Sequence, residues 1–125
     1  MKSLAILGST GSVGTSALAV AANCRRLCRV RTLAAGSNWR RLARQIAEHR
    51  PARASLSDEK AFLKLRRRGV FNGTRLCCGP DGLQEVIRDP VVNWVLVAIA
   101  GAAGLPASLG AVEAKKPVAL ANKES

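Results

Sequence analysis

The sequence predicts an α/β protein built on one doubly wound parallel sheet, with helices on both faces of the sheet. Short apolar stretches alternate along the chain with stretches of helical length, which is the pattern of repeated strand–helix–strand units. The first apolar stretch runs directly into a glycine-rich turn, and a helical stretch of small residues leaves that turn. This order, placed at the start of the chain, is typical of a Rossmann-like sheet.

The first strand and the first helix flank the glycine-rich turn. Leu4–Leu7 is the apolar strand that enters the turn, and Thr15–Asn23 is the helix that leaves it. Arg29–Ala35 is predicted as the second strand, and it ends at Gly36.

A second helix is predicted over Trp39–Arg50, because Leu42 and Ile46 recur there with helical period. Asn38 is a suitable N-cap for this helix, since its side-chain oxygen can accept a bond from the first turn. Pro51 follows the helix end, where proline is common.

The middle of the chain predicts shorter elements. A short strand is expected over 52–56, and Ser57 opens a helix that runs to about Arg68. Residues 74–78 suit a short edge strand. Gly79–Gly82 is then expected to form a turn, followed by a short helix that ends near Arg88.

Two further apolar strands complete the prediction. Asn93–Ile99 shows no polar alternation, so it fits a strand buried on both faces of a parallel sheet. A tight turn at 101–104 leads to a helix over Leu105–Ala114, and residues 117–121 form the last strand.

Length and composition restrict the class of protein. A chain of 125 residues with 48% apolar residues allows one domain with a real core. No apolar run reaches the roughly 18 residues of a membrane span, so no membrane partner is expected. Glycines and hydroxyls at 8–16 interrupt any signal-peptide core, and we expect a cytoplasmic protein. The four cysteines fit no usual zinc spacing and are expected to be reduced thiols.

The net charge of +12 is concentrated in one central block. Residues 25–75 contain fifteen Lys and Arg residues against three acidic residues. Such a block attracts phosphate-rich ligands or nucleic acid, and it equally suits a solvated surface or one that a partner covers. A basic nucleic-acid-binding module is therefore one alternative function. Against it, the chain has only four aromatic residues and no recognisable nucleic-acid-binding signature, so we expect no nucleic-acid partner.

The glycine-rich turn predicts a phosphate-binding loop. Gly8, Gly11 and Gly14 are spaced as Gly-x-x-Gly-x-x-Gly, a relative of the commoner dinucleotide fingerprint. Glycine lets the backbone bend sharply and approach a pyrophosphate closely. The free N–H groups at the start of the helix then face the anion, and the helix dipole adds to the attraction.

The segment after the second strand indicates which dinucleotide is bound. An acidic residue there favours NAD, because it bonds the ribose 2′-hydroxyl, whereas hydroxyl, amide or Arg groups favour the 2′-phosphate of NADP. Here Gly36, Ser37 and Asn38 are followed by Arg40 and Arg41, with no acid among them. We therefore predict a preference for NADPH over NADH, with solvent-facing arginines as the alternative interpretation of Arg40 and Arg41.

Three stretches together resemble the 1-deoxy-D-xylulose 5-phosphate reductoisomerase family. They are Ile6–Gly14 (Ile-Leu-Gly-Ser-Thr-Gly-Ser-Val-Gly), Ala35–Asn38, and Gly101–Leu105 leading to Leu120–Ser125. Their order and separation are similar to the N-terminal NADPH-binding domain of that family across essentially the whole chain. The Gly-Ala-Ala-Gly turn and the final Ala-Asn-Lys-Glu-Ser are more specific than the glycine loop.

The resemblance implies an oxidoreductase that uses NADPH and a divalent metal (Mg²⁺, Mn²⁺ or Co²⁺) and works as a homodimer. Such enzymes isomerise the sugar phosphate 1-deoxy-D-xylulose 5-phosphate and reduce it to 2-C-methyl-D-erythritol 4-phosphate, in non-mevalonate isoprenoid biosynthesis. Lys123 matches a substrate contact of the family. The residues that match cofactor contacts are Gly8, Thr10, Gly11, Ser12, Val13, Gly36, Ser37, Asn38, Asn122 and Glu124.

The family also differs from this chain in two respects. Family members are much longer, and their metal ligands, substrate-phosphate clamp and mobile lid lie beyond the matched residues. Residues 1–125 are therefore expected to form an incomplete NADPH-binding domain that holds no catalytic or metal-binding residue and does not turn over alone. Position 37 is often basic in the family, whereas Ser37 is neutral, so 2′-phosphate recognition would fall to Arg40 or Arg41.

The NADP-binding domain of another reductase, such as a homoserine or semialdehyde dehydrogenase relative, is a further alternative. The terminal segment Asn122–Ser125 discriminates between the two families and favours the reductoisomerase.

Overall fold

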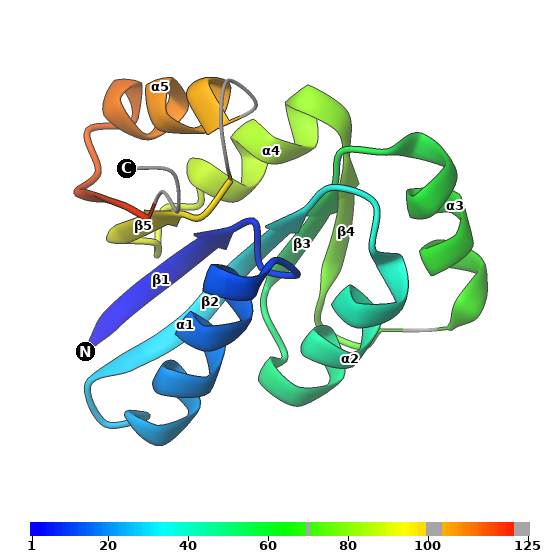
Figure 1. Ribbon diagram of the computed structural model, residues 1–125, viewed down its shortest axis with the longest axis horizontal. Coiled ribbons are helices and arrows are strands. Elements are labelled where there is room, and N and C mark those ends of the chain that lie inside the picture. The colour runs from blue at the N-terminus through cyan, green and yellow to red at the C-terminus, as the bar shows by residue number, and fades with distance from the viewer. Residues whose placement is uncertain (70, 100–103, 122–125) are drawn as a thin grey trace.

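The computed structural model describes residues 1–69, 71–99 and 104–121. In these residues, six parallel strands form one sheet in the order β4-β3-β2-β1-β5-β6 (Figure 1). The strands are β1 (Lys2–Leu7), β2 (Cys28–Ala35), β3 (Arg53–Leu56), β4 (Arg75–Cys78), β5 (Trp94–Val97) and β6 (Val118–Leu120). The helices are α1 (Ser12–Asn23), α2 (Trp39–His49), α3 (Glu59–Arg68), α4 (Gly79–Ile87) and α5 (Leu105–Glu113). The predicted doubly wound parallel sheet is confirmed.

The strand order reverses at β1. From β1 the chain moves outward through β2 and β3 to β4, and α4 then carries it back to β5 on the other side of β1. Ile6 pairs with Leu33 of β2 and with Leu96 of β5, so β1 is fully enclosed in the sheet. In open parallel sheets, ligands bind beyond the carboxyl ends of the strands at such a reversal point.

Helices cover both faces of the sheet, as predicted. The helices α1, α2 and α3 lie on one face, and α4 and α5 lie on the other (Figure 1). Successive strand residues point to opposite faces, so Ile6 packs into the first core and Leu7 into the second. Both side chains are fully buried, and burial of each stabilises the fold by about 2 kcal/mol.

The ends of α2 and α3 follow from local sequence. Asn38 Oδ1 accepts a bond from the Arg41 amide at 3.2 Å, which confirms the predicted cap. Asp58 caps α3 in the same way, with its carboxylate 3.1 Å from the Ala61 amide. Arg50 ends α2 in the left-handed conformation (φ 48°), and Pro51 then prevents continuation.

Two expectations about where helices begin need correction. Helix α1 begins at Ser12 rather than Thr15, so the loop between β1 and α1 is shorter than expected. The predicted turn at Gly79–Gly82 is wrong, because these residues are the first turn of α4. Pro80 is tolerated there, since the first helical amides have no intrahelical acceptor. The negative charge of Asp81 in the same turn interacts favourably with the helix dipole.

The strand predicted at Asn93–Ile99 is shorter, and it is not fully buried on both faces. Strand β5 covers only Trp94–Val97, and within it Val95 and Val97 are buried while Trp94 and Leu96 are half-buried. The Lys2 ammonium lies 5.3 Å from the centre of the Trp94 ring, so the open side of this ring is covered by a cation rather than by apolar side chains.

A buried ion-pair network fixes the segment just after α4 to the middle of β2 and the start of β3. The side chain of Asp89 has no solvent exposure, and it pairs with Arg53 and with Arg31, whose Nε lies 3.3 Å from the carboxylate. The Val91 amide donates to Asp89 Oδ1 at 2.9 Å. This network satisfies a carboxylate that would otherwise be costly to bury.

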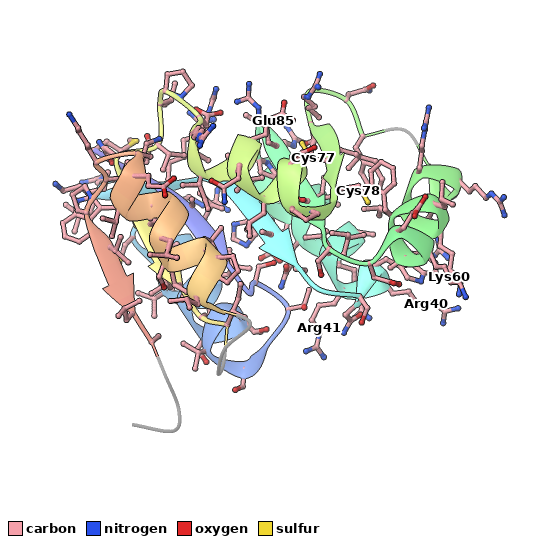
Figure 2. The ribbon with its side chains drawn as sticks, turned by 90° about the horizontal axis from the view of Figure 1, so that it is seen from above. Arg40, Arg41, Lys60, Cys77, Cys78 and Glu85 are labelled. Atoms are coloured by element: carbon pink, nitrogen blue, oxygen red, sulfur yellow. The ribbon has the colours of Figure 1, made fainter. Side chains whose placement is uncertain are left out.

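A thiol lies beside a carboxylate where β4 meets α4 (Figure 2). The Cys77 Sγ is 3.4 Å from Glu85 Oε2. Burial, together with the charge and the hydrogen bond of Glu85, raises the pKa of the Cys77 thiol to about 11. This thiol is therefore a structural group in its protonated form.

Among the described residues, no helix is both long enough and apolar enough to cross a bilayer.

Candidate functional site

The loop between β1 and α1 requires glycine at two positions. Gly8 has φ +87°, which side-chain-bearing residues rarely adopt, and a Cβ there would lie 2.5 Å from the Ala98 carbonyl oxygen. A Cβ on Gly14 would lie 2.1 Å from the Gly8 carbonyl oxygen. The two glycines therefore let the first turn of α1 close tightly onto the end of β1.

The loop is held in place by the neighbouring strand and helix. The amides of Gly8 and Ser9 both donate to the Ala34 carbonyl of β2, at 2.7 and 3.0 Å. From α2, Gln45 Nε2 donates to the Ser9 carbonyl at 2.8 Å. Three bonds from two elements thus fix the loop before any ligand is bound, and preorganisation of this kind lowers the cost of binding.

The start of α1 offers backbone donors to an anion. Gly11 is the N-cap and provides no side-chain bond, and the first turn carries no acidic residue. In the part of the chain that the structure describes, the amides of Ser12, Val13 and Gly14 have no acceptor. These donors and the positive end of the helix dipole suit a phosphate group, and the binding of one at Thr10–Val13 stays a prediction.

The second predicted loop, Gly36–Asn38, lies beside the first. It follows β2, whose Ala34 pairs with Leu7 of β1, so the two loops share the carboxyl edge of the sheet. All three residues are exposed. Because Asn38 Oδ1 caps α2, it is the Nδ2 group that is available to donate to a ligand.

The two arginines that follow have different positions. Arg41 Nη1 donates to the Thr10 carbonyl at 3.0 Å, so this guanidinium lies against the phosphate-binding loop. The Arg40 guanidinium instead lies 5.1 Å from the centre of the Trp39 ring. Figure 2 shows both arginines with Lys60 of α3 along one margin of the molecule. The structure therefore favours Arg41 over Arg40 as a ligand-binding residue.

A hollow of about 460 Å³ opens between α1 and α2 beside the phosphate-binding loop. Ser12 and Thr15 line it from α1, and Arg41 lines it from α2. Two hydroxyls and a guanidinium therefore face one space, which begins beside the free amides of α1 and runs along the two helices as far as Glu48 and His49. Such a donor set matches phosphate and ribose oxygens, and it fits the dinucleotide that the sequence predicts.

Gln45 is a site residue that the sequence argument missed. It lies one turn after Arg41 and is buried between the apolar positions Leu42 and Ile46, although its side chain is polar. Within residues 1–69, 71–99 and 104–121, Gln45 Oε1 and the neighbouring Ser9 Oγ have no hydrogen-bond partner. A glutamine on the apolar face of a helix was the available signal, because a buried amide needs polar partners.

Some predicted site residues lie outside the described residues. These are Asn122, Lys123 and Glu124. Residues 101–103 of the predicted turn also lie outside the described residues. Strand β6, which precedes the first three, pairs with β5 and so ends at the same edge as the phosphate-binding loop. In the described part of the chain, no group of three His, Cys, Asp or Glu side chains is placed to hold a metal ion.

Comparison with known proteins identifies a family. Residues 4–125 match the model of the family described as 1-deoxy-D-xylulose 5-phosphate reductoisomerase. Proteins of this name from Anaeromyxobacter sp. (strain K) and Anaeromyxobacter dehalogenans (strain 2CP-1 / ATCC BAA-258) are each 46% identical over 125 residues. The match covers 100% of this chain and 32% of each relative, so the chain spans about a third of their length.

Solved structures of the same family share the fold. The reductoisomerase from Zymomonas mobilis in complex with NADPH has a TM-score of 0.88 and 33% identity, over 99% of this chain and 32% of that one. A DOX-P reductoisomerase in complex with magnesium has a TM-score of 0.90 and 37% identity, over 100% of this chain and 32% of that one. Another DOX-P reductoisomerase, in complex with NADPH, fosmidomycin and magnesium, has a TM-score of 0.86 and 37% identity, over 100% of this chain and 31% of that one. With a family match over residues 4–125 and relatives 46% identical, the chain belongs to the 1-deoxy-D-xylulose 5-phosphate reductoisomerase family of oxidoreductases.

Proposed function

We propose that this chain is the NADPH-binding part of an enzyme that converts 1-deoxy-D-xylulose 5-phosphate to 2-C-methyl-D-erythritol 4-phosphate. The observation that carries the proposal is the preorganised glycine loop at the start of α1, where unpaired amides lie beside the reversal point of the sheet. The family membership and the NADPH in two similar solved structures support it. NADPH supplies the hydride for the reductive half of that reaction.

The two loops divide the cofactor between them. The amides of Ser12, Val13 and Gly14 bind the pyrophosphate, because they have no acceptor in the described residues and lie at the positive end of the helix. Ser37 and the Nδ2 group of Asn38 bind the adenosine side, where both residues are exposed beside the loop.

Arg41 supplies the charge that recognises the 2′-phosphate. Ser37 is neutral, and the loop after β2 contains no acid that would repel a phosphate. The guanidinium of Arg41 is already held 3.0 Å from the Thr10 carbonyl, which leaves its other N–H groups to donate to a phosphate. Arg40 is a suitable control, because its guanidinium lies over Trp39 instead.

The remaining groups of the reaction belong to other residues. We propose that Asn122 and Glu124 complete the cofactor site and that Lys123 donates to substrate oxygens that gain charge in the transition state. In full-length members of the family, we propose that the divalent metal and the substrate phosphate are held by parts other than the third of the protein that this chain matches. The chain by itself therefore binds NADPH as a single domain without turnover.

Titration of the purified chain with NADPH, and with NADH as the comparison, tests this function. We expect saturable binding that favours NADPH. Arg41→Gln should weaken NADPH binding about tenfold and leave NADH binding nearly unchanged, since one charged hydrogen-bond partner of the 2′-phosphate is lost. Arg40→Gln should change neither.

Each failure has its own meaning. No saturable binding of either nucleotide would overturn the proposed function. Equal affinity for both nucleotides would overturn only the preference for NADPH. An equal loss in both arginine variants would remove the specific role of Arg41 and leave a general charge effect.

A further inference from the structure

A second hollow lies at the opposite edge of the sheet from the glycine loop. It has a volume of about 570 Å³ and lies between the carboxyl-terminal ends of α1 and α2. We call it the amino-edge hollow, lined by Arg25, Cys28, Arg29, Glu48, His49 and Arg50 together with an apolar floor. Helix α1 has 12 residues and separates the glycine loop from this hollow by roughly 17 Å, although Glu48 and His49 also line the hollow beside the glycine loop.

Three unpaired guanidinium groups converge on the amino-edge hollow. Arg25 comes from the connection between α1 and β2, Arg29 is the second residue of β2, and Arg50 is the residue that ends α2. In the residues that the structure describes, none of the three belongs to an ion pair or donates a side-chain hydrogen bond. Glu48 is the one carboxylate that lines the hollow. The space therefore carries an excess of positive charge with free planar donors.

The floor of the hollow is apolar. Ala21 of α1 and Val30 of β2 line it and are 5% and 6% exposed, and Ala47 of α2 lines its wall. The volume lies inside the range of about 300–1,000 Å³ that is usual for small-molecule sites. A rim of arginines over an apolar floor suits a ligand with an anionic group and an organic body.

The other cationic side chains of the central basic block are arranged differently. Arg66 and Arg67 are exposed in the last turn of α3, and neither lines one of the hollows described above. A high density of arginines alone therefore does not make such a site. The amino-edge hollow also requires the gap between the ends of α1 and α2.

We propose that the amino-edge hollow is a second anion-binding site, which binds a small molecule that carries one or two phosphate groups. Arginine forks match phosphate oxygens in pairs, and Arg25 and Arg29 line the same hollow four positions apart in the sequence, so they can hold one phosphate together. Arg50 closes the site from α2. The proposal is independent of the nucleotide that binds at the opposite edge.

His49 lines both the amino-edge hollow and the hollow beside the glycine loop, so its signal reports anion binding in either one, and the arginine variants distinguish the two. It is the chain's only histidine, so its Cε1 proton gives one identifiable NMR signal. Burial lowers the pKa of His49, and the nearby charges of Glu48 and Arg25 act on it in opposite directions. A bound phosphate adds negative charge and should raise this pKa. The charged groups that line the same or the adjoining hollow are Met1 (its amino terminus), Arg25, Arg29, Arg41, Arg44, Glu48 and Arg50.

The test is a titration of the 125-residue chain with inorganic pyrophosphate at constant ionic strength, followed by the His49 ring signal. We expect a saturable change and a rise in the pKa of His49. Arg25→Gln with Arg29→Gln should weaken binding at least tenfold. Arg66→Gln with Arg67→Gln removes the same charge from α3 and should leave binding unchanged. A second arm with inorganic phosphate shows whether one phosphate group suffices.

Three results would overturn the proposal. These are the absence of a saturable change, an equal loss in the two double variants, and a loss caused by Arg41→Gln alone, which would place the anion at the nucleotide edge. If Arg25→Gln with Arg29→Gln lacks a cooperative thermal transition, Arg25→Lys with Arg29→Lys replaces it. The lysine variant keeps the charge but loses the forked donors, so it should weaken binding several-fold, and unchanged affinity would contradict the site.

Discussion

Gly14→Ala is a substitution for which helix propensity and packing predict opposite results. Gly14 lies in the first turn of α1 and is buried. Propensity alone favours alanine over glycine by about 1 kcal/mol in a helix. In the fold, however, the new Cβ would lie 2.1 Å from the Gly8 carbonyl oxygen and 2.7 Å from the Ser9 Cα.

The size of the effect follows from what must move. A carbon–oxygen contact of about 3.3 Å is normal, so the Gly8 peptide has to shift by about 1 Å. That shift stretches the bond from the Gly8 amide to the Ala34 carbonyl, which is 2.7 Å long, and the bond from the Gly11 amide to Gly8. Overpacking costs about 1–3 kcal/mol and a weakened hydrogen bond about 1 kcal/mol. After the gain in propensity, we expect a net loss of about 2 kcal/mol.

Urea denaturation of the variant measures this loss, and Gly11→Ala is the matched control. A Cβ on Gly11 would meet the Gly8 carbonyl at 3.6 Å, an ordinary contact, so only the modest N-cap preference is lost, at about 0.5–1 kcal/mol. Gly14→Ala should also weaken NADPH binding, because the shifted loop carries the phosphate donors. A Gly14→Ala variant that is as stable as the parent chain would refute the reasoning.

Two further predictions concern the buried groups on the α4 side of the sheet. Asp89→Asn should lower the free energy of unfolding by about 2–3 kcal/mol, since it leaves two arginines without their buried partner. The control is Asp81→Asn at the exposed start of α4, which should lower the free energy of unfolding by less than about 1 kcal/mol. Burial alone would raise the pKa of Asp89, but its backbone hydrogen bond and arginine partners outweigh burial and hold the pKa below its ordinary value. The stability that Asp89 provides is therefore full above the ordinary carboxyl pKa of about 4 and is lost as the pH falls through the lower pKa of the folded state. Urea denaturation at a series of pH values between about 6 and 2 measures this loss. Identical pH profiles of stability for Asp89→Asn and the parent would contradict it. Cys77, with its pKa raised to about 11, should react with iodoacetamide at pH 8 about 100-fold more slowly than an ordinary thiol. Labelling followed by mass spectrometry measures this rate, and Glu85→Gln should recover part of it. Fast labelling of Cys77 in the folded parent would contradict the assigned environment.

The sheet and the phosphate-binding loop could be predicted because their signals are local. A strand, a glycine loop and a helix follow one another in the sequence, and each later strand is an apolar run bounded by helical stretches. The Asn38 cap was equally predictable, since it depends on residues three positions apart. The first turn of α4 was mistaken for a free turn because Gly and Pro are common in both.

The contacts that complete the site could not be predicted, because they depend on how α2 packs against the loop. Nothing local distinguishes Arg40 from Arg41, yet one lies over Trp39 and the other reaches the Thr10 carbonyl. Gln45 contacts the Ser9 carbonyl from 36 positions away in the sequence. Such contacts are fixed by the register between helix and strand rather than by any pattern in the sequence.

The distribution of the basic block is also a property of the fold. In the sequence it is one stretch from 25 to 75, but the structure divides it among different places. Arg25 and Arg29 lie at the amino edge, Arg41 lies at the carboxyl edge, and Arg66 and Arg67 lie at the end of α3. A parallel sheet separates the two ends of every helix, so one charge block in the sequence becomes several surfaces.

Amide hydrogen exchange of the chain with and without NADPH tests the central claim most directly. The proposed site lies in the loops after β1 and β2, so NADPH should slow exchange in peptides that cover 8–15 and 36–41. NADH should protect 8–15 with less effect on 36–41, because it lacks the 2′-phosphate. Protection that falls elsewhere, or saturable binding with no protection of 8–15, would contradict the assignment of the glycine loop as the cofactor site.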